Sequence, residues 1–161
     1  MLKQSLLLPA LILSLHAGAS QSQKNELAEK LIHATAVLEM IKASVPGLNS
    51  KCIDKAWRQR SPELNQAYQD EYSGEELQQL NQVFLTQAGK HYVADMLNKV
   101  RLNKGLPVMQ TVNFNEQEQQ LVRDFFETPT GKKFSSGSSA QRMQSVGMQV
   151  GFGISVDCFK K

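Results

Sequence analysis

Residues 72–92 read YSGEELQQLNQVFLTQAGKHY, and residues 114–134 read FNEQEQQLVRDFFETPTGKKF. The second stretch begins 42 positions after the first and aligns with it without a gap. The aligned pairs are Ser73 with Asn115, Glu76 with Glu118, Phe84 with Phe126, Thr86 with Thr128, Gly89 with Gly131 and Lys90 with Lys132. Similarity at a fixed period of this length indicates a duplicated supersecondary unit. We interpret each unit as helix–turn–helix and place the units at 72–104 and 114–146.

Both units carry signals for the start of a helix. Ser73 followed three residues later by Glu76 is a capping box, in which each side chain bonds the backbone amide of the other residue. Asn115 and Glu118 offer a close equivalent. Each first helix then meets a Thr-x-x-Gly sequence, where the threonine is suited to cap the next helix. The second helices are therefore predicted over 88–104 and from residue 129 towards the C-terminus.

The rest of the chain also shows helical periodicity. Apolar residues recur every three or four positions over 24–44, which predicts one helix there. A second helix is predicted over 50–60, and Ser61 followed by Pro62 indicates a new helix start. No segment shows sustained period-two alternation. The predicted fold is a single all-α bundle of about six or seven helices.

The C-terminal stretch contains three closely spaced glycines: Gly147, Gly151 and Gly153. Each glycine weakens a helix by about 1 kcal/mol relative to alanine. On a helix Gly147 and Gly151 would share a face and allow close approach of a neighbour. We predict a tightly packed terminal helix, with an irregular end as the alternative.

The first 19 residues have the form of a cleaved signal peptide. Lys3 is followed by an apolar run over 6–13, and Ala17-Gly18-Ala19 has the small-x-small form of a cleavage site. The alternative, an N-terminal membrane anchor, is disfavoured because the run is shorter than the roughly 20 residues that span a bilayer. We predict cleavage after Ala19, a single helical domain over 20–161, a periplasmic location and no membrane span in the mature chain.

Two cysteines, Cys52 and Cys158, follow the predicted cleavage site. In an oxidising compartment such a pair most simply forms one disulfide bond. Free thiols or a redox pair are the alternative, and no Cys-x-x-Cys spacing supports it. Trp57, close to Cys52 in sequence, is predicted to pack over the disulfide.

Charge argues against one class of partner. The chain has 18 Lys and Arg, 15 Asp and Glu and a formal net charge of +3. The basic residues are interleaved with acidic ones rather than clustered, which does not favour nucleic-acid binding.

The segment from Tyr72 to Phe134 resembles the domain-of-unknown-function 2059 family of bacterial exported proteins. The resemblance rests on the sequences FNEQE over 114–118 and FFETPTGKKF over 125–134. The first unit departs from the family pattern, with Gln87 where proline is usual and His91 where a second lysine would stand. The resemblance implies an all-helical periplasmic protein and brings no activity, catalytic residue or cofactor.

The second turn invites a phosphate-loop interpretation, but it lacks one glycine and has Lys133 where Ser or Thr is needed. Lysines in the first turn of a helix are unusual, because the positive end of the helix dipole disfavours cations. We therefore consider a possible anion site made of Lys90, Gly131, Lys132 and Lys133. The alternative is that these lysines pair with carboxylates or extend into solvent, and we favour that alternative.

No catalytic set, metal-ligand spacing or cofactor motif is apparent; His33 and His91 have no partner at ligand spacing. The leading hypothesis is a non-enzymatic module of adaptor or immunity type that binds another envelope or exported protein. The second hypothesis is a carrier that holds a small hydrophobic or anionic ligand between the repeats. The sequence does not specify an oligomeric state.

Overall fold

Alpha helices account for all the regular secondary structure in residues 20–109 and 111–159, the part of the chain that our computed structural model describes. The predicted signal peptide lies outside these residues. The described part forms eight helices, and the all-α prediction is confirmed: α1 (Gln21–Ala34), α2 (Val37–Ser44), α3 (Ser50–Glu71), α4 (Gly74–Phe84), α5 (Gln87–Asn103), α6 (Glu116–Glu127), α7 (Pro129–Ser135) and α8 (Gly137–Phe159). None of these helices is both long and apolar enough to cross a bilayer.

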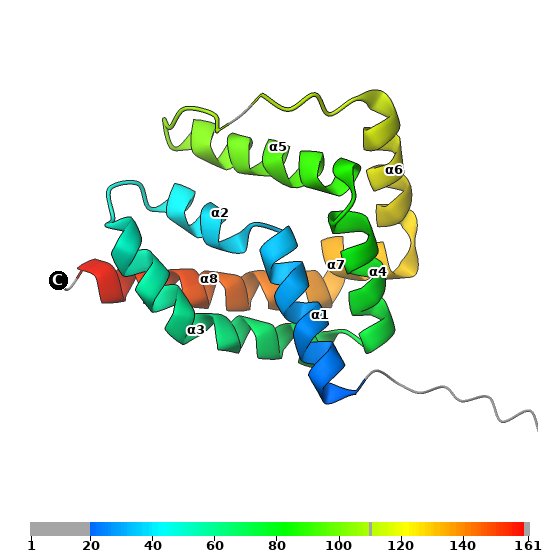
Figure 1. Cartoon of the computed structure of the whole chain (residues 1–161), viewed down its shortest axis with the longest axis horizontal. Helices are drawn as coiled ribbons and strands as arrows, with labels where there is room; N and C mark the ends of the chain where they lie inside the picture. The colour runs from blue at the N-terminus through cyan, green and yellow to red at the C-terminus, as the bar shows by residue number, and fades with distance from the viewer. Residues whose placement is uncertain (1–19, 110, 160–161) are drawn as a thin grey trace, which may run out of the picture.

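The N-terminal stretch is two helices rather than the single predicted one. Helix α1 ends at Ala34, where the Thr35 hydroxyl donates to the Leu31 carbonyl at 2.8 Å. Ala36 then adopts a left-handed conformation with φ of 51°. This conformation is unfavourable for a residue with a Cβ, so no local signal announces it. The break lets α1 pack on α3 and α4 while α2 packs against α5 (Figure 1).

Helix α3 is one continuous helix, so the prediction of two separate helices here, over 50–60 and from Ser61, is wrong. Pro62 lies inside α3 and Ser61 is not an N-cap. Proline cannot donate the backbone hydrogen bond expected at that position, a loss of about 3 kcal/mol in a helix interior. Buried apolar residues lie on the same face of the helix both before and after the proline. The buried apolar residues of that face are Ile53, Ala56, Leu64 and Tyr68.

The two predicted turns have matching local geometry. Thr86 accepts a hydrogen bond from the Gly89 amide at 3.1 Å, and Thr128 accepts one from the Gly131 amide at 3.0 Å. A Cβ added at Gly89 would lie 2.3 Å from the carbonyl oxygen of residue 83, and at Gly131 it would lie 2.0 Å from that of residue 125. Both glycines are therefore required because the preceding helix passes too close for any side chain. Both units also have the predicted capping boxes.

Aromatic side chains fill the space between the units, and their contacts run crosswise. Phe84 of the first unit packs on Phe134 of the second at 5.2 Å between ring centroids, and Tyr92 packs on Phe126 at 5.5 Å. Phe84 aligns with Phe126, and Tyr92 aligns with Phe134. Exchanging the two units therefore converts one of these contacts into the other. Such exchange is the pattern that a two-fold relation produces.

The second unit departs from the predicted range at its end. The predicted single helix from residue 129 breaks at Ser136, and Gly137 follows with φ of 76°. Helix α8 then runs along α3, and the disulfide between Cys52 and Cys158 joins the start of α3 to the end of α8. The predicted cysteine pairing is confirmed. Helix α8 stays regular to Phe159, so the terminal glycines are helical; Gly153 lies against the Arg60 guanidinium, which binds Asp157 at 2.9 Å.

A candidate ligand-binding pocket

The lysines of the repeat turns lie in surface contacts. Lys132 pairs with Glu127 at 3.0 Å, and Lys133 pairs with Glu76 at 3.0 Å while lying over the Tyr72 ring. Lys90 is exposed and Gly131 is buried. The Lys132–Glu127 pair is exposed and contributes at most about 1 kcal/mol, whereas the Lys133–Glu76 pair is half-buried. The lysines do not converge on a shared enclosed space, and this arrangement favours the surface-contact alternative.

The contact of Lys133 has a counterpart in the other unit. His91, which aligns with Lys133, lies 2.7 Å from Glu118, which aligns with Glu76. Each of these glutamates also closes the capping box of its own helix. The crosswise relation of the aromatic rings thus extends to these side-chain contacts of the two glutamates. Because rings and polar contacts occupy the interface between the units, the structure does not favour the hypothesis of a ligand held there.

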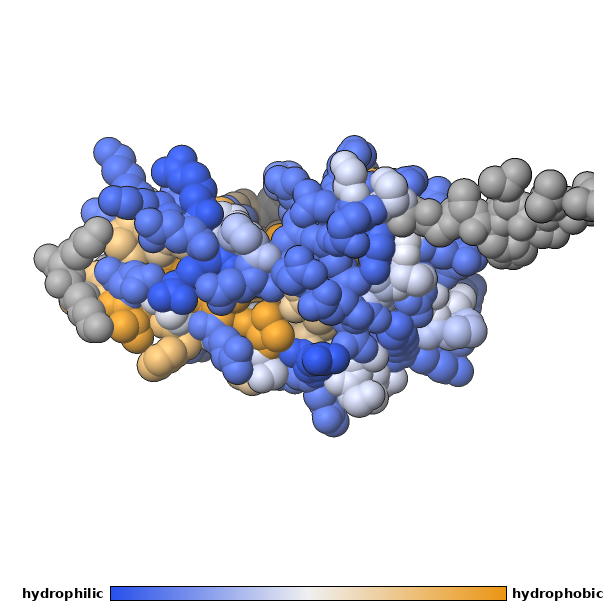
Figure 2. Space-filling model, turned by 90° about the horizontal axis from the view of Figure 1, so that it is seen from below, coloured by the Kyte–Doolittle hydropathy of each residue, from blue (hydrophilic) through white to orange (hydrophobic). Residues whose placement is uncertain are grey.

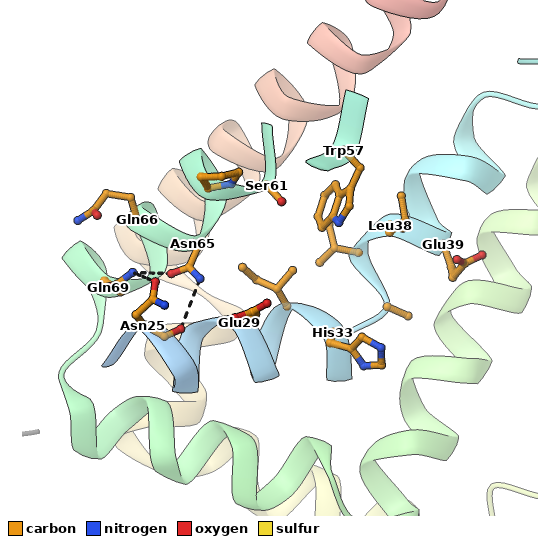
Figure 3. Close-up of a pocket in the computed structure, with 14 residues that line it drawn as sticks. Asn25, Glu29, His33, Leu38, Glu39, Trp57, Ser61, Asn65, Gln66 and Gln69 are labelled. Atoms are coloured by element: carbon orange, nitrogen blue, oxygen red, sulfur yellow. Dashed lines mark hydrogen bonds between the residues drawn. The ribbon is translucent and has the colours of Figure 1, made fainter. Parts of the chain in front are cut away.

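A cavity of about 640 Å³ lies instead between α1, α2 and α3 (Figure 3). Its volume is within the range of small-molecule sites in proteins, about 300–1,000 Å³. Helix α1 supplies Asn25, Glu29 and His33 at intervals of four residues. Helix α3 supplies Trp57, Ser61, Asn65 and Gln69 at the same interval. Residues four apart lie on one face of a helix, so two polar helix faces form the opposing walls.

The apolar part of the cavity is formed by Trp57 with Ile32, Val37 and Leu38. Figure 3 shows the indole ring of Trp57 pointing from α3 towards the cavity. The prediction that Trp57 packs over the disulfide is corrected, because five helical residues place it about 140° around α3 from Cys52. The left-handed Ala36 also lines the cavity, so the break between α1 and α2 helps to shape it.

Side-chain amides gather at the other end of the cavity. Gln69 is 95% buried, with a relative exposure of 5%. Its amide nitrogen donates to the Asn25 side-chain oxygen at 3.2 Å and also to that of Asn65, and its oxygen accepts from Gln21. The Asn65 amide nitrogen donates to the backbone oxygen of residue 25 at 3.4 Å. These hydrogen bonds link α1 to α3 at this end of the cavity.

Besides the imidazole of His33, the titratable groups that line the cavity in the described part of the chain are carboxylates. Glu29 is exposed at the rim, and Glu39 lies on α2. Glu39 shares Lys42 with Asp54; the Lys42 ammonium is 3.2 Å from Glu39 and 2.8 Å from Asp54. The hydrogen bond with Asp54 is the main cause that raises the pKa of Lys42, against a smaller opposing effect of burial. Lys42 is therefore held mainly by Asp54, outside the cavity.

A second, shallower apolar groove of about 420 Å³ separates α2 from α8. Its α8 side includes Met148 and Phe152, whose relative exposures are 61% and 73%. Gly147 and Gly151 also line the groove, and because they lack side chains they leave it open. Figure 2 shows apolar surface gathered at the end of the molecule where α8 terminates, on a face that is otherwise mostly hydrophilic.

The sequence interpretation missed the cavity, although the four-residue spacing of polar residues on both helices was visible. That spacing is also normal for a solvated helix face, and it becomes a site only where two such faces meet. Among residues 20–109 and 111–159, no group of three or more His, Cys, Asp and Glu is placed to hold a metal ion.

No family model, curated protein or solved structure matches this chain. The resemblance to the domain-of-unknown-function 2059 family stays a prediction. The fold and the site define a class: an all-α, disulfide-bonded protein with a preformed pocket between its first three helices.

Proposed function

We propose that this is an exported, non-enzymatic binding protein that holds a small organic ligand between α1, α2 and α3. The observation that supports the proposal most directly is the cavity of about 640 Å³, with an indole ring on one side and hydrogen-bonded side-chain amides at one end. The buried Gln69 helps to keep the cavity open, because collapse would break its hydrogen bonds with Asn25 and Asn65. The predicted signal peptide and the disulfide between α3 and α8 support a role in the periplasm.

Trp57 makes this proposal directly testable, because it is the only tryptophan in the chain. Its fluorescence and its single indole N–H signal in a nitrogen-15 NMR spectrum therefore report on the pocket alone. We expect members of a chemically diverse fragment set to shift that indole signal in the mature protein. Signals of Asn65 and Gln69 side-chain amides should move in the same titrations.

A cavity-filling variant provides the control. Ser61→Tyr places a ring in the cavity from a half-buried lining position and should abolish the shifts. Ser138→Tyr adds the same ring at an exposed position outside the pocket and should leave them unchanged. The proposal fails if no fragment moves the indole signal of the folded protein, or if Ser61→Tyr binds as the wild type does.

A second candidate function is docking of another exported protein, which was the leading hypothesis from the sequence. The apolar groove between α2 and α8 favours it, because an amphipathic helix of a partner could lie between these helices. Replacing Met148 and Phe152 with serine should then abolish co-purification of that partner from envelope extract. The same partner should cross-link to a photoreactive residue at position 152 and not to one at exposed Gln120.

A further inference from the structure

Of the lysine, arginine and carboxylate side chains in the described residues, only the carboxylates of Glu29 and Glu39 line the pocket, so its formal charge is negative. We infer that its ligand is an organic cation with an apolar body, such as an aryl- or alkylammonium. This inference rests on the binding function proposed above and specifies its ligand class. Three observations carry it: the charge of the lining, the engagement of the amides and the position of the indole ring.

The charge of the lining is opposite in sign to that of the chain. The chain has a formal net charge of +3, yet no lysine or arginine of the described residues lines the cavity, whereas Glu29 and Glu39 do. Within residues 20–109 and 111–159, Glu29 has no ion-pair partner. Lys42 is shared between Glu39 and Asp54, so that group retains a net negative charge. An anionic ligand would meet two carboxylates, whereas a cation would find Glu29 without an ion-pair partner and Glu39 in a group of net negative charge.

The side-chain amides Gln66 and Gln69 in the pocket lining already form hydrogen bonds within the protein. Gln69 bonds Asn25, Asn65 and Gln21, and Gln66 donates to the Asp70 carboxylate at 2.7 Å. The Gln69 side-chain amide is therefore already engaged and is not available to a ligand. The carboxylates of Glu29 and Glu39 can accept hydrogen bonds from an ammonium group. Lys24, a cation at the amide end, is held by the backbone oxygen of Gln69.

The indole ring supplies the remaining element of cation recognition. Trp57 lies beside the aliphatic side chains of Ile32, Val37 and Leu38, which suits the apolar body of a ligand. Tryptophan is also the aromatic side chain that attracts cations most strongly, by about 0.5–2 kcal/mol according to exposure. An ammonium group between the ring and the rim carboxylates would interact with both.

The inference is tested with three probes of one shape and different charge: 2-phenylethylammonium, 2-phenylethanol and 3-phenylpropionate. Each is titrated into the mature protein at low salt, with the Trp57 fluorescence and indole N–H as readouts. We expect the ammonium to bind about tenfold more tightly than the alcohol, and the carboxylate to bind most weakly. Added salt should weaken the binding of the ammonium and not that of the alcohol.

Charge-neutralising variants locate the effect. The double variant Glu29→Gln, Glu39→Gln should bind the ammonium and the alcohol equally. The control double variant Glu63→Gln, Glu75→Gln makes the same change in net charge at exposed residues outside the pocket and should keep the tenfold preference. If both double variants lose the preference for the ammonium to the same extent, the inference is overturned, because the preference would then reflect the overall charge of the protein.

The outcomes separate the two proposals. If the alcohol or the carboxylate binds as tightly as the ammonium, the cation inference is overturned while the binding function stands. If none of the three probes binds but other fragments move the indole signal, the inference is again overturned and the function again stands. If neither the probes nor the fragments bind, both fail.

Discussion

The two helix–turn–helix units share one turn and differ in the length of the helix beyond it. In the first unit α5 continues for 17 residues beyond Thr86, whereas in the second α7 ends after 7 residues beyond Thr128. The aligned positions at the point of divergence are Ala94 and Asp95 in the first unit and Ser136 and Gly137 in the second. Gly137 thus has a left-handed backbone conformation, whereas the aligned Asp95 continues the helix α5.

This difference shows how one local motif serves two tertiary roles. The threonine cap and the glycine fix the angle between consecutive helices through contacts within six residues. The path of the chain after the second turn is decided by Gly137, which redirects it so that α8 packs along α3. The first unit closes against α2 and α6, and the second supplies the helix that the disulfide joins to α3.

The largest expected effect comes from breaking the bond that holds the divergent end of the second unit. The disulfide links residues 106 positions apart, for which the chain-entropy model gives an upper figure of about 4–5 kcal/mol. We expect Cys52→Ser with Cys158→Ser to lower the free energy of unfolding by about 4 kcal/mol in urea denaturation. Reduction of the wild type should reproduce this loss. A loss below about 1 kcal/mol would show that packing of α8 on α3 suffices.

The next effect tests whether the two turns are equivalent. Alanine at Gly89 or Gly131 would place a Cβ 2.3 Å or 2.0 Å from a backbone carbonyl oxygen, and backbone cannot move aside cheaply. Each substitution should therefore cost about 3 kcal/mol or more. Gly147→Ala is the control, because its Cβ would meet nothing within 4 Å and alanine favours the helix. Stabilities of Gly89→Ala and Gly131→Ala that differ by more than about 2 kcal/mol would contradict equivalence.

An exchange at the point of divergence should have a smaller effect. Ser136→Ala with Gly137→Asp gives the second unit the residues of the first. Since Gly137 has φ of 76°, a side chain there is strained by about 1–2 kcal/mol if α8 keeps its place. We expect a loss of that size with unchanged circular dichroism, measured by thermal and urea denaturation. A stabilised variant with greater helicity would mean that α7 and α8 have joined.

The smallest effect concerns the aligned glutamates. Burial would raise the pKa of the Glu76 carboxyl, but the Ser73 backbone amide and the Lys133 ammonium outweigh it, and the pKa is lowered. A carboxyl with a lowered pKa stabilises the fold above its ordinary pKa and loses that contribution as pH falls through the folded-state value. Glu76→Gln should therefore cost about 1 kcal/mol at neutral pH, with the difference from wild type shrinking below about pH 4.

The matched variant Glu118→Gln completes this comparison. The partner of Glu118 is the imidazole of His91 rather than a lysine ammonium. Removing the Glu118 carboxylate should therefore lower the free energy of unfolding at neutral pH by less than removing that of Glu76. Equal losses with the same pH dependence would show that the capping boxes alone account for both.

The sequence by itself determined the features that are completed within a few residues. The capping boxes of α4 and α6, the caps Thr86 and Thr128 and the two glycines follow from local hydrogen bonds and sterics, and the structure has them as predicted. The disulfide was predictable for a different reason, because only two cysteines exist to pair. The all-α class followed from the helical periodicity of nearly every segment.

Tertiary structure alone decided the breaks, the cross-contacts and the pocket. No local signal made Ala36 left-handed or kept Pro62 inside α3; both follow from how much apolar surface the resulting packing buries. The pocket joins Asn25 and Glu29 to residues of α3 that lie some 30 to 40 positions away. Its existence depends on the distance between helix axes, which side chains from several helices set together. Periodicity identifies the face that a helix buries, whereas only packing determines where two polar faces leave room for a ligand.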